Sequence, residues 1–272
     1  MNPVVGTAMS PPSKKSLAND PTDESGRPYH IRLSKKDVGR VALLPGDPGR
    51  VPRIAEKLDG AREIGSHREY LAYAGRAGDE RVVVMSTGIG GPSTSIAIEE
   101  LAGLGVQVMI RVGTCGSIVP SVKVGSLVIA DAAVRMDGTT GQYVHHGYPA
   151  ASAPGVTMAL KDSASILRKT AVIGIAASTD SFYVGQGRKS FGGYFPSGKS
   201  RLIEDLVQAK VLCFEMEAST LFTLGRIFGL KTGAILAVVG NRATDEFRLE
   251  AGVGDAIDVA LGAVKRLRKY GA

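Results

Sequence analysis

The chain has 272 residues, of which 44% are hydrophobic and 22% charged, a composition typical of a globular protein with a sizeable core. The formal net charge is +7, but the basic residues are scattered apart from a cluster at 265–269 without interleaved aromatics, so we expect no nucleic-acid partner. No apolar run is long enough to span a membrane, and the N-terminus lacks a signal-peptide core. The two cysteines lie far apart in the sequence and form no disulfide framework, so we expect a cytoplasmic protein.

Residues 1–28 are rich in Pro, Ser, Lys, Asp and Gly, and predict a disordered tail before a single folded domain at 29–272. A strand is expected at 41–44, followed by the turn PGDPGR at 45–50 and a helix that ends near residue 58. Asp47 would cap this helix, with Pro48 at its first position. Alternatively, Gly46 and Arg50 would bind an anion at the helix N-terminus.

The sequence SHREY at 66–70 is either a charged edge strand or part of a site reached from a neighbouring subunit. RVVVMS at 81–86 predicts a core strand, and the Gly-rich turn TGIGGPST at 87–94 leads into a helix through residue 104. This βαβ unit contains no Gly-Lys-Ser/Thr of a P-loop. Arg111 occupies the region where a dinucleotide-binding protein would carry its acidic residue, which counts against a dinucleotide.

The stretch VQVMIRVGTCGSI at 106–118 begins as a buried strand and continues into small residues with two glycines. We interpret residues 113–117 as a turn in which backbone N–H groups approach an anion. Arg111 at the end of the strand would add a guanidinium to that anion site. The alternative is an ordinary strand-to-loop turn beside an arginine that reaches solvent.

The rest of the chain alternates strands and helices, so the class is α/β, with a three-layer arrangement of a central mixed sheet between helices. The adjacent histidines in the polar loop 135–154 lack metal-ligand spacing. The expected strands lie at 125–134, 171–177, 211–214 and 231–239. The expected helices lie at 158–169, 199–208, 215–228 and about 249–269.

Two further stretches carry candidate site residues. In STDSFYVGQGR at 178–188, Phe182 can stack on a flat ring, and Gln186 and Arg188 can hydrogen-bond its edge, unless this is only a polar surface loop. Glu215 and Glu217 stand at a strand-to-helix junction. There, one carboxylate can enter a pocket while the other supports it, or both can serve only as helix-dipole partners.

These motifs, in this order from about residue 30 to residue 242, resemble the nucleoside phosphorylase family with trimeric or hexameric architecture. The resemblance implies reversible phosphorolysis, in which uridine and phosphate give uracil and ribose 1-phosphate. It rests on the following stretches: PGDP with Arg50, SHRE at 66–69, STGIGGPSTS at 86–95, RVGT at 111–114, Phe182 with Gln186 and Arg188, and Glu215-Met216-Glu217.

The resemblance also assigns roles. Phosphate would contact Gly46, Arg50, Arg111 and Thr114, with Arg68 from a neighbouring subunit; ribose would contact Thr114, Met216 and Glu217, with His30 from that neighbour; and the base would contact Phe182, Gln186 and Arg188. Arg111, Gln186, Arg188 and Arg242 would act in catalysis. No cofactor is required, phosphate being a co-substrate. A potassium ion is implied near Glu69, Ile89 and Ser93 at the interface of a hexamer built as a trimer of dimers.

Three alternatives remain open. A purine nucleoside phosphorylase of the same fold is disfavoured by Gln186, Arg188 and Arg242, because a purine leaving group needs a general acid at N7. A nucleosidase that uses water is disfavoured by the three arginines placed for phosphate. A non-catalytic nucleoside-binding relative is disfavoured because it would have no need for the residues placed to bind phosphate.

Overall fold

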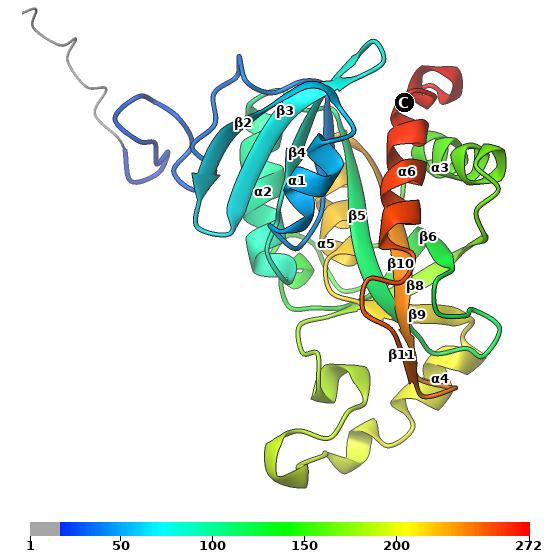
Figure 1. Cartoon of the computed structure of the whole chain (residues 1–272). Coiled ribbons are helices and arrows are strands. Elements are labelled where there is room, and N and C mark those ends of the chain that lie inside the picture. The colour runs from blue at the N-terminus through cyan, green and yellow to red at the C-terminus, as the bar shows by residue number, and fades with distance from the viewer. Residues whose placement is uncertain (1–16) are drawn as a thin grey trace, which may run out of the picture.

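The computed structural model describes residues 17–272, which contain six α-helices and eleven strands (Figure 1). The strands are β1 (Val41–Leu44), β2 (Asp59–His67), β3 (Tyr70–Ala77), β4 (Glu80–Met85), β5 (Val108–Ser117), β6 (Leu127–Met136), β7 (Ala150–Ala151), β8 (Ala171–Thr179), β9 (Val211–Glu215), β10 (Lys231–Asn241) and β11 (Glu246–Phe247). The helices are α1 (Arg50–Ala55), α2 (Gly91–Gly103), α3 (Pro154–Ile166), α4 (Leu202–Gln208), α5 (Ala218–Ile227) and α6 (Val253–Val264).

The strands form one mixed sheet, ten of them in the order β11-β10-β6-β8-β9-β5-β1-β4-β3-β2, while the short β7 pairs with β6 beside this order. β5 also pairs with β10, so that β10, β6, β8, β9 and β5 close on themselves. The pairs β4–β1, β1–β5 and β5–β10 are parallel, as are β6–β8 and β8–β9. The pairs β10–β6 and β5–β9 are antiparallel, and so are the pairs that β2, β3 and β11 form towards the edges. The expected central mixed sheet is confirmed.

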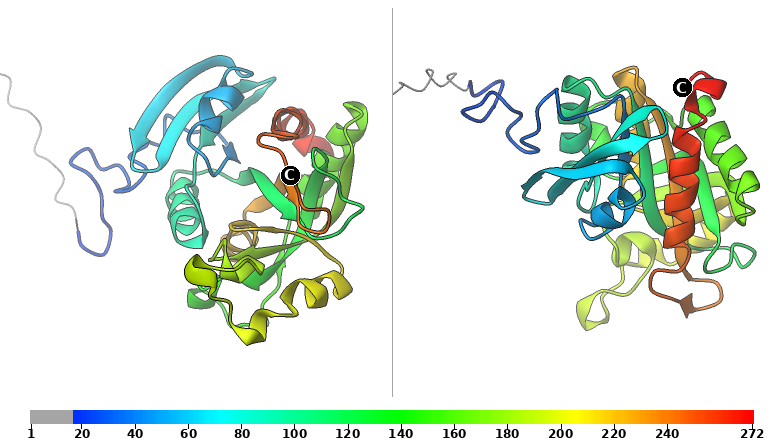
Figure 2. Two further views of the ribbon diagram at one scale, coloured as in Figure 1. Left: turned by 60° about the horizontal axis from the view of Figure 1, so that its bottom comes forward. Right: turned by 45° about the horizontal axis from the view of Figure 1, so that its top comes forward.

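Helices cover both faces of this sheet. On one face, Val51 of α1, Leu160 of α3 and Ile257 of α6 are buried in a single apolar cluster against the central strands. On the other face, Ile98 of α2 and Phe222 of α5 are buried in a second cluster. Figure 2 shows α3 and α6 side by side on the first face. The three-layer prediction is therefore confirmed, since burial of both faces needs a helical layer on each.

The hairpin of β2 and β3 was not predicted as a pair of strands. Most residues of β2 are exposed and several are charged, so the strand lacks the alternation that marks a half-buried edge. The turn of the hairpin is formed by Arg68 and Glu69, and Arg68 adopts a left-handed backbone with a φ of 54°. SHREY is therefore the tip of a hairpin rather than one continuous strand.

The prediction of a turn at 113–117 is wrong, because β5 continues to Ser117. Gly113 pairs with Leu236 of β10, and Gly116 pairs with Phe214 of β9, so the sheet ladders use this backbone. Gly113 serves a different purpose: a Cβ at this position would lie 2.7 Å from the guanidinium carbon of Arg111. The small residue makes room for the arginine rather than for an anion beside the backbone.

Several predicted helix boundaries also differ. The cap prediction for Asp47 is wrong: its carboxylate accepts a hydrogen bond from the backbone N–H of Gly49 at 2.8 Å, and α1 begins only at Arg50. The last helix starts at Val253 instead of near 249, because Gly252 before it takes a left-handed φ of 72°. α1 ends at 55 rather than 58, α3 spans 154–166 rather than 158–169, and α4 starts at 202 rather than 199.

The predicted N-terminal tail extends to residue 28. Residues 1–16 lie outside the described part of the chain. Residues 17–28 make local turns, with isolated bridges between Leu17 and Asp20 and between Thr22 and Pro28. The tail stays a prediction. Within residues 17–272, no helix combines the length and apolar character needed to cross a membrane.

Candidate active site

One cavity of about 850 Å³ opens where β1, β4, β5, β9 and β10 end. Ligands of α/β sheets bind at the carboxyl ends of parallel strands, which is where this cavity lies. It gathers twelve of the predicted site residues: Gly46, Arg50, Glu69, Ile89, Arg111, Thr114, Phe182, Gln186, Arg188, Met216, Glu217 and Arg242. His30, Arg68 and Ser93 are the predicted site residues that do not line it.

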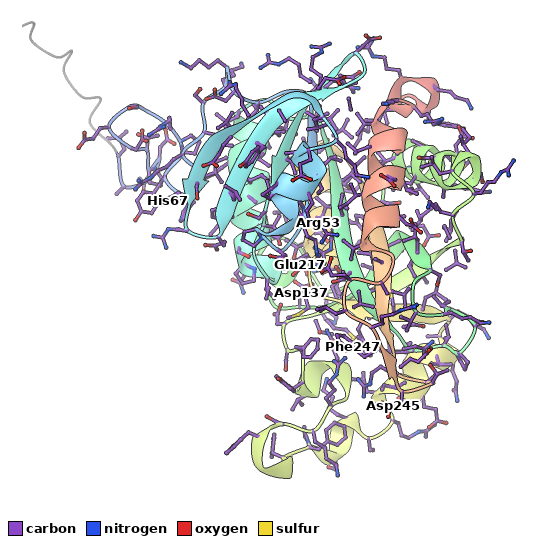
Figure 3. All side chains as sticks on the ribbon, viewed as in Figure 1. Arg53, His67, Asp137, Glu217, Asp245 and Phe247 are labelled. Carbon is purple, nitrogen blue, oxygen red and sulfur yellow. The ribbon has the colours of Figure 1, made fainter. Side chains whose placement is uncertain are left out.

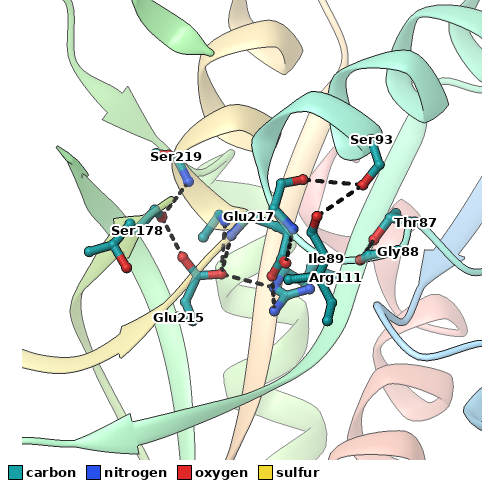
Figure 4. A network of polar contacts seen from close by, with 12 residues as sticks. Thr87, Gly88, Ile89, Ser93, Arg111, Ser178, Glu215, Glu217 and Ser219 are labelled. Carbon is teal, nitrogen blue, oxygen red and sulfur yellow. Dashed lines mark hydrogen bonds and ion pairs between the residues drawn. The ribbon is translucent and has the colours of Figure 1, made fainter. Parts of the chain in front are cut away.

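Arg111 is the centre of the inner end of the cavity (Figure 4). Its side chain is only 7% exposed, and its Nε donates to Oε2 of Glu215 at 3.0 Å while Nη2 pairs with Oε2 of Glu217. Its third nitrogen, Nη1, is buried without a hydrogen-bond partner among the described residues. A buried guanidinium N–H without a partner is costly, so Nη1 marks the place where a ligand acceptor fits.

Glu215 supports this arrangement from the end of β9. Its carboxylate accepts hydrogen bonds from the backbone N–H groups of Glu217 and Ala218, both at 2.9 Å, and from the hydroxyl of Ser178. These contacts fix the start of α5 and orient Arg111. The predicted division, in which one carboxylate supports while the other enters the pocket, describes the geometry found here.

Glu217 reaches the cavity and also accepts a hydrogen bond from the N–H of Gly90, at the start of α2, at 2.6 Å. Burial raises the pKa of Glu217, Arg111 opposes that change, and the negative charge of Glu215 adds to it. The pKa of Arg111 is raised as well: burial opposes its charge, but Glu217 and Glu215 outweigh that effect. Arg111 therefore stays charged between two acidic groups.

Arg50 and Gly46 complete the inner end. Arg50 is the first residue of α1, and its Nε, like Nη1 of Arg111, is buried without a hydrogen-bond partner in the part of the chain that the structure describes. Burial lowers the pKa of Arg50, Asp47 and Glu250 oppose that change, and the positive charge of Arg111 adds to it. A Cβ on Gly46 would lie 3.2 Å from the carbonyl oxygen of Gly88 and 3.8 Å from Nη1 of Arg111, so Gly46 lies directly beside that nitrogen. Two neighbouring guanidinium groups with free buried donors form a site for an oxyanion.

The outer end of the cavity is built from the 182–188 loop. Arg188 donates from Nη1 to the carbonyl of Phe182 and to Oε1 of Gln186, both at 2.7 Å, and its guanidinium carbon lies 4.0 Å from the centre of the Phe182 ring. Gln186 is 3% exposed, and its Nε2 donates to Thr179 Oγ1 at 3.3 Å. The structure thus joins the three residues predicted to recognise the base.

Arg242 follows the end of β10 and holds this loop in place. Its Nη1 donates to the carbonyl of Gln186 at 2.9 Å, and its Nη2 to the carbonyl of Gly187 at 3.2 Å. Burial lowers the pKa of Arg242 and that of Arg188, which also faces the positive charge of Arg242. Arg242 therefore contacts the backbone of the 182–188 loop.

In the hairpin of β10 and β11, which forms a wall of the cavity, Arg242 is the one residue that sequence reasoning named as a site residue. Asp245, Glu246 and Phe247 line its outer end, and Figure 3 labels Asp245 and Phe247 on this hairpin. Asp245 takes a left-handed φ of 54°, and Phe247 is 73% exposed. A two-residue strand with an exposed aromatic gives no periodic signal, and only Gly240, which pairs with Phe247, marked the approach of another strand.

The mixed sheet and the arginine-lined cavity at its edge are those expected of a nucleoside phosphorylase, and comparisons with known proteins agree. The chain belongs to the Phosphorylase superfamily, whose family model matches residues 40–269. It is 52% identical to a uridine phosphorylase of Thermococcus kodakarensis, covering 93% of this chain and 91% of that protein. It is 35% identical to the uridine phosphorylase of Escherichia coli, over 88% and 97%. It is also 35% identical to a guanosine phosphorylase of Halorubrum lacusprofundi, over 78% and 83%.

Proposed function

We propose that this protein catalyses the reversible phosphorolysis of uridine to uracil and ribose 1-phosphate. The observation that carries the proposal is the pair of unpartnered, buried guanidinium nitrogens on Arg50 and Arg111, which lie in one cavity with Glu217 and the Gln186–Arg188 pair. Similarity over most of the chain to curated uridine phosphorylases supports the pyrimidine substrate. The enzyme is then a pentosyltransferase.

Phosphate is the nucleophile in this reaction. It would be held by Gly46, Arg50, Arg111 and Thr114, and its negative charge would stabilise the positive charge that develops on the ribose as the C1′–N bond breaks. Because Arg111 is anchored by two carboxylates, it needs no rearrangement to meet the anion. Water would be a poor substitute, since it is neutral and supplies no counter-charge to the two guanidinium groups or to the positive charge that develops on the ribose.

Ribose would lie between the two ends of the cavity, against Thr114, Met216 and Glu217. An ionised Glu217 accepts hydrogen bonds from ribose hydroxyls, and its contacts to Arg111 and Gly90 fix its orientation. Glu217 would thereby contact the ribose directly and the phosphate through Arg111. This sharing fixes the nucleophile relative to the sugar carbon that it attacks.

The base would stack on Phe182, and Gln186 and Arg188 would recognise its edge. As uracil leaves, its ring gains negative charge, which donors on Gln186 and Arg188 stabilise. Nη1 of Arg188 donates to Oε1 of Gln186 at 2.7 Å, so base binding would exchange that hydrogen bond for new ones. Arg242 would act through the backbone of the same loop.

The site would be shared between subunits. His30 and Arg68 lie outside the cavity of their own chain, which supports their contribution to a neighbour in a hexamer built as a trimer of dimers. Glu69, Ile89 and Ser93 converge at Gly88: a Cβ there would lie 2.8 Å from Glu69 Cγ and 3.1 Å from Ser93 Oγ. Such oxygen donors fit a potassium ion at the interface. Cys115 and Cys213 are free, which fits a cytoplasmic enzyme.

The test follows uridine absorbance with and without phosphate, beside inosine and guanosine. Loss of uridine alone, and only with phosphate, is the expected result. Phosphate-dependent cleavage of a purine nucleoside alone would retain the phosphate site and overturn the base assignment, while phosphate-independent cleavage would indicate a hydrolase. A gel-filtration mass near the 28.4 kDa of one chain would contradict the shared site.

A further inference from the structure

Glu100 holds His30 at several points, although Glu100 does not line the cavity described above. Glu100, near the end of α2, accepts hydrogen bonds from the backbone N–H of His30 at 3.2 Å and from that of Ile31 at 2.8 Å. Its Oε1 also lies 2.6 Å from Nδ1 of His30. The side chain of Glu100 is 16% exposed and that of His30 is 28% exposed, so the contact is partly shielded from water.

This contact sets the tautomer of His30. An ionised carboxylate only accepts hydrogen bonds, so the proton of the neutral imidazole lies on Nδ1. The other nitrogen, Nε2, is then a free acceptor, directed away from Glu100. An acceptor at this position suits a hydroxyl group that donates, such as a 5′-hydroxyl of ribose.

The same segment also holds the tip of the β2–β3 hairpin. His67 Nδ1 lies 2.7 Å from the carbonyl oxygen of His30. Arg68, the next residue, donates to the hydroxyl of Tyr29 at 3.4 Å, and its guanidinium carbon lies 5.7 Å from the centre of that ring. Glu100 therefore anchors a unit that carries both residues proposed to reach a neighbouring site.

We infer that Glu100 is a positioning residue: it holds His30 as the Nδ1–H tautomer, so that Nε2 accepts a hydrogen bond from the 5′-hydroxyl of uridine bound in the neighbouring subunit. The inference rests on the proposed function, because it needs uridine as the substrate. Glu100 itself touches no reacting atom. Its effect passes through one hydroxyl of the substrate, and that hydroxyl can be removed.

The experiment compares uridine with 5′-deoxyuridine, which lacks the hydroxyl, in wild type and in Glu100→Gln. The amide keeps an oxygen for the backbone N–H groups of His30 and Ile31 but can also donate, so it no longer enforces the Nδ1–H tautomer. We expect kcat/KM for uridine to fall about tenfold, the equivalent of one hydrogen bond, and kcat/KM for 5′-deoxyuridine to change less than about twofold. His30→Ala should show the same pattern, and adding Glu100→Gln to it should cause no further loss.

Glu99→Gln is the matched control. Glu99 is the preceding residue on α2, is exposed and contacts Tyr143 instead of His30, so both substrates should react at the wild-type rate. Equal losses on the two substrates in Glu100→Gln would mean that Glu100 has a merely structural role and would overturn the inference.

A second measurement needs neither activity nor a variant that folds. The sequence contains four histidines, so ¹⁵N spectra of histidine-labelled wild-type protein can assign the tautomer of His30. A proton on Nδ1 is expected, and a proton on Nε2 would overturn the inference. If wild type shows no phosphate-dependent loss of uridine, the proposed function fails. The ¹⁵N spectra still decide the tautomer of His30 separately.

Discussion

The two ends of the cavity are built on different principles. At the inner end, Arg111 and Glu217 are almost fully buried, and they extend from a central strand and from the residue preceding a helix. At the outer end, Arg188 and Arg242 extend from loops, are partly buried and contact mostly backbone carbonyls. Phe182 and Phe247 beside them are half or more exposed.

This difference separates the chemistry from the choice of base. The proposed phosphate and ribose contacts depend on an ion-pair network in which each charge needs the others, so no member can change alone. The proposed base contacts depend on side chains that satisfy one another locally, so a substitution there disturbs fewer neighbours.

The largest effect is expected from Arg111→Ala. Removal of this guanidinium leaves Glu215 and Glu217 buried side by side without their cation, and breaking a buried ion pair costs about 3–5 kcal/mol of unfolding free energy. Phosphorolysis should fall below detection, because the phosphate loses its central donor. Urea unfolding monitored by circular dichroism gives the stability, and uridine absorbance gives the rate.

Arg242→Ala is the comparison for that variant at the outer end. Its two hydrogen bonds go to carbonyls of a partly exposed loop, so we expect a loss of only about 1 kcal/mol in stability. Equal destabilisation by the two substitutions would refute the distinction between the ends.

A smaller and more selective effect is expected from Gln186→Leu. The change removes the amide proposed to face the base and leaves Arg188 Nη1 with one acceptor, the carbonyl of Phe182. We expect kcat/KM for uridine to fall about a hundredfold, while phosphate affinity, measured by protection against thermal unfolding, stays within about twofold of wild type. Gln208→Leu, at an exposed position of α4, is the matched control and should leave both unchanged. Loss of phosphate affinity in Gln186→Leu would show that the two ends are not independent.

The sequence predicted the inner end better than the outer end. Arg111 and Gly113 were recognisable because a charged residue in a buried strand next to small residues is rare, although the turn inferred from them is in fact a continuous strand. Glu215 and Glu217 were recognisable from the junction of a strand and a helix. Asp245 and Phe247 were not, because the position of a short hairpin depends on tertiary contacts and leaves no period in the sequence.

The pH dependence of the ligand-free protein sharpens the comparison further. Burial and the charge of Glu215 hold the pKa of Glu217 above the usual range of a glutamate, despite the attraction of Arg111. Between the ordinary and the raised pKa, folded protein holds a proton that unfolded protein releases. The contribution of Glu217 to stability therefore decreases as the pH rises through this interval. Uridine needs the carboxylate, so its affinity should increase over the same interval.

Uridine binding is measured by calorimetry without phosphate, so that the titration of phosphate does not enter. Glu217→Gln should bind uridine more weakly and without this pH dependence. An affinity for uridine in wild type that stays constant through the interval would contradict the raised pKa.

The smallest effect is expected at the ion pair of Arg53 and Glu250, which links α1 to the segment after β11. The two side chains are 44% and 40% exposed, so salt and water screen the pair, and exposed pairs contribute about 0–1 kcal/mol. Arg53→Ala should shift the KM for phosphate less than about twofold, even though Arg50 lies one turn earlier on the same helix. Lys57→Ala, which breaks the similar pair between the turn after α1 and Asp258 of α6, is the control. A larger change in the KM for phosphate in Arg53→Ala alone would mean that the hairpin of β10 and β11 is coupled to the phosphate site. The two ends of the cavity would then not be independent.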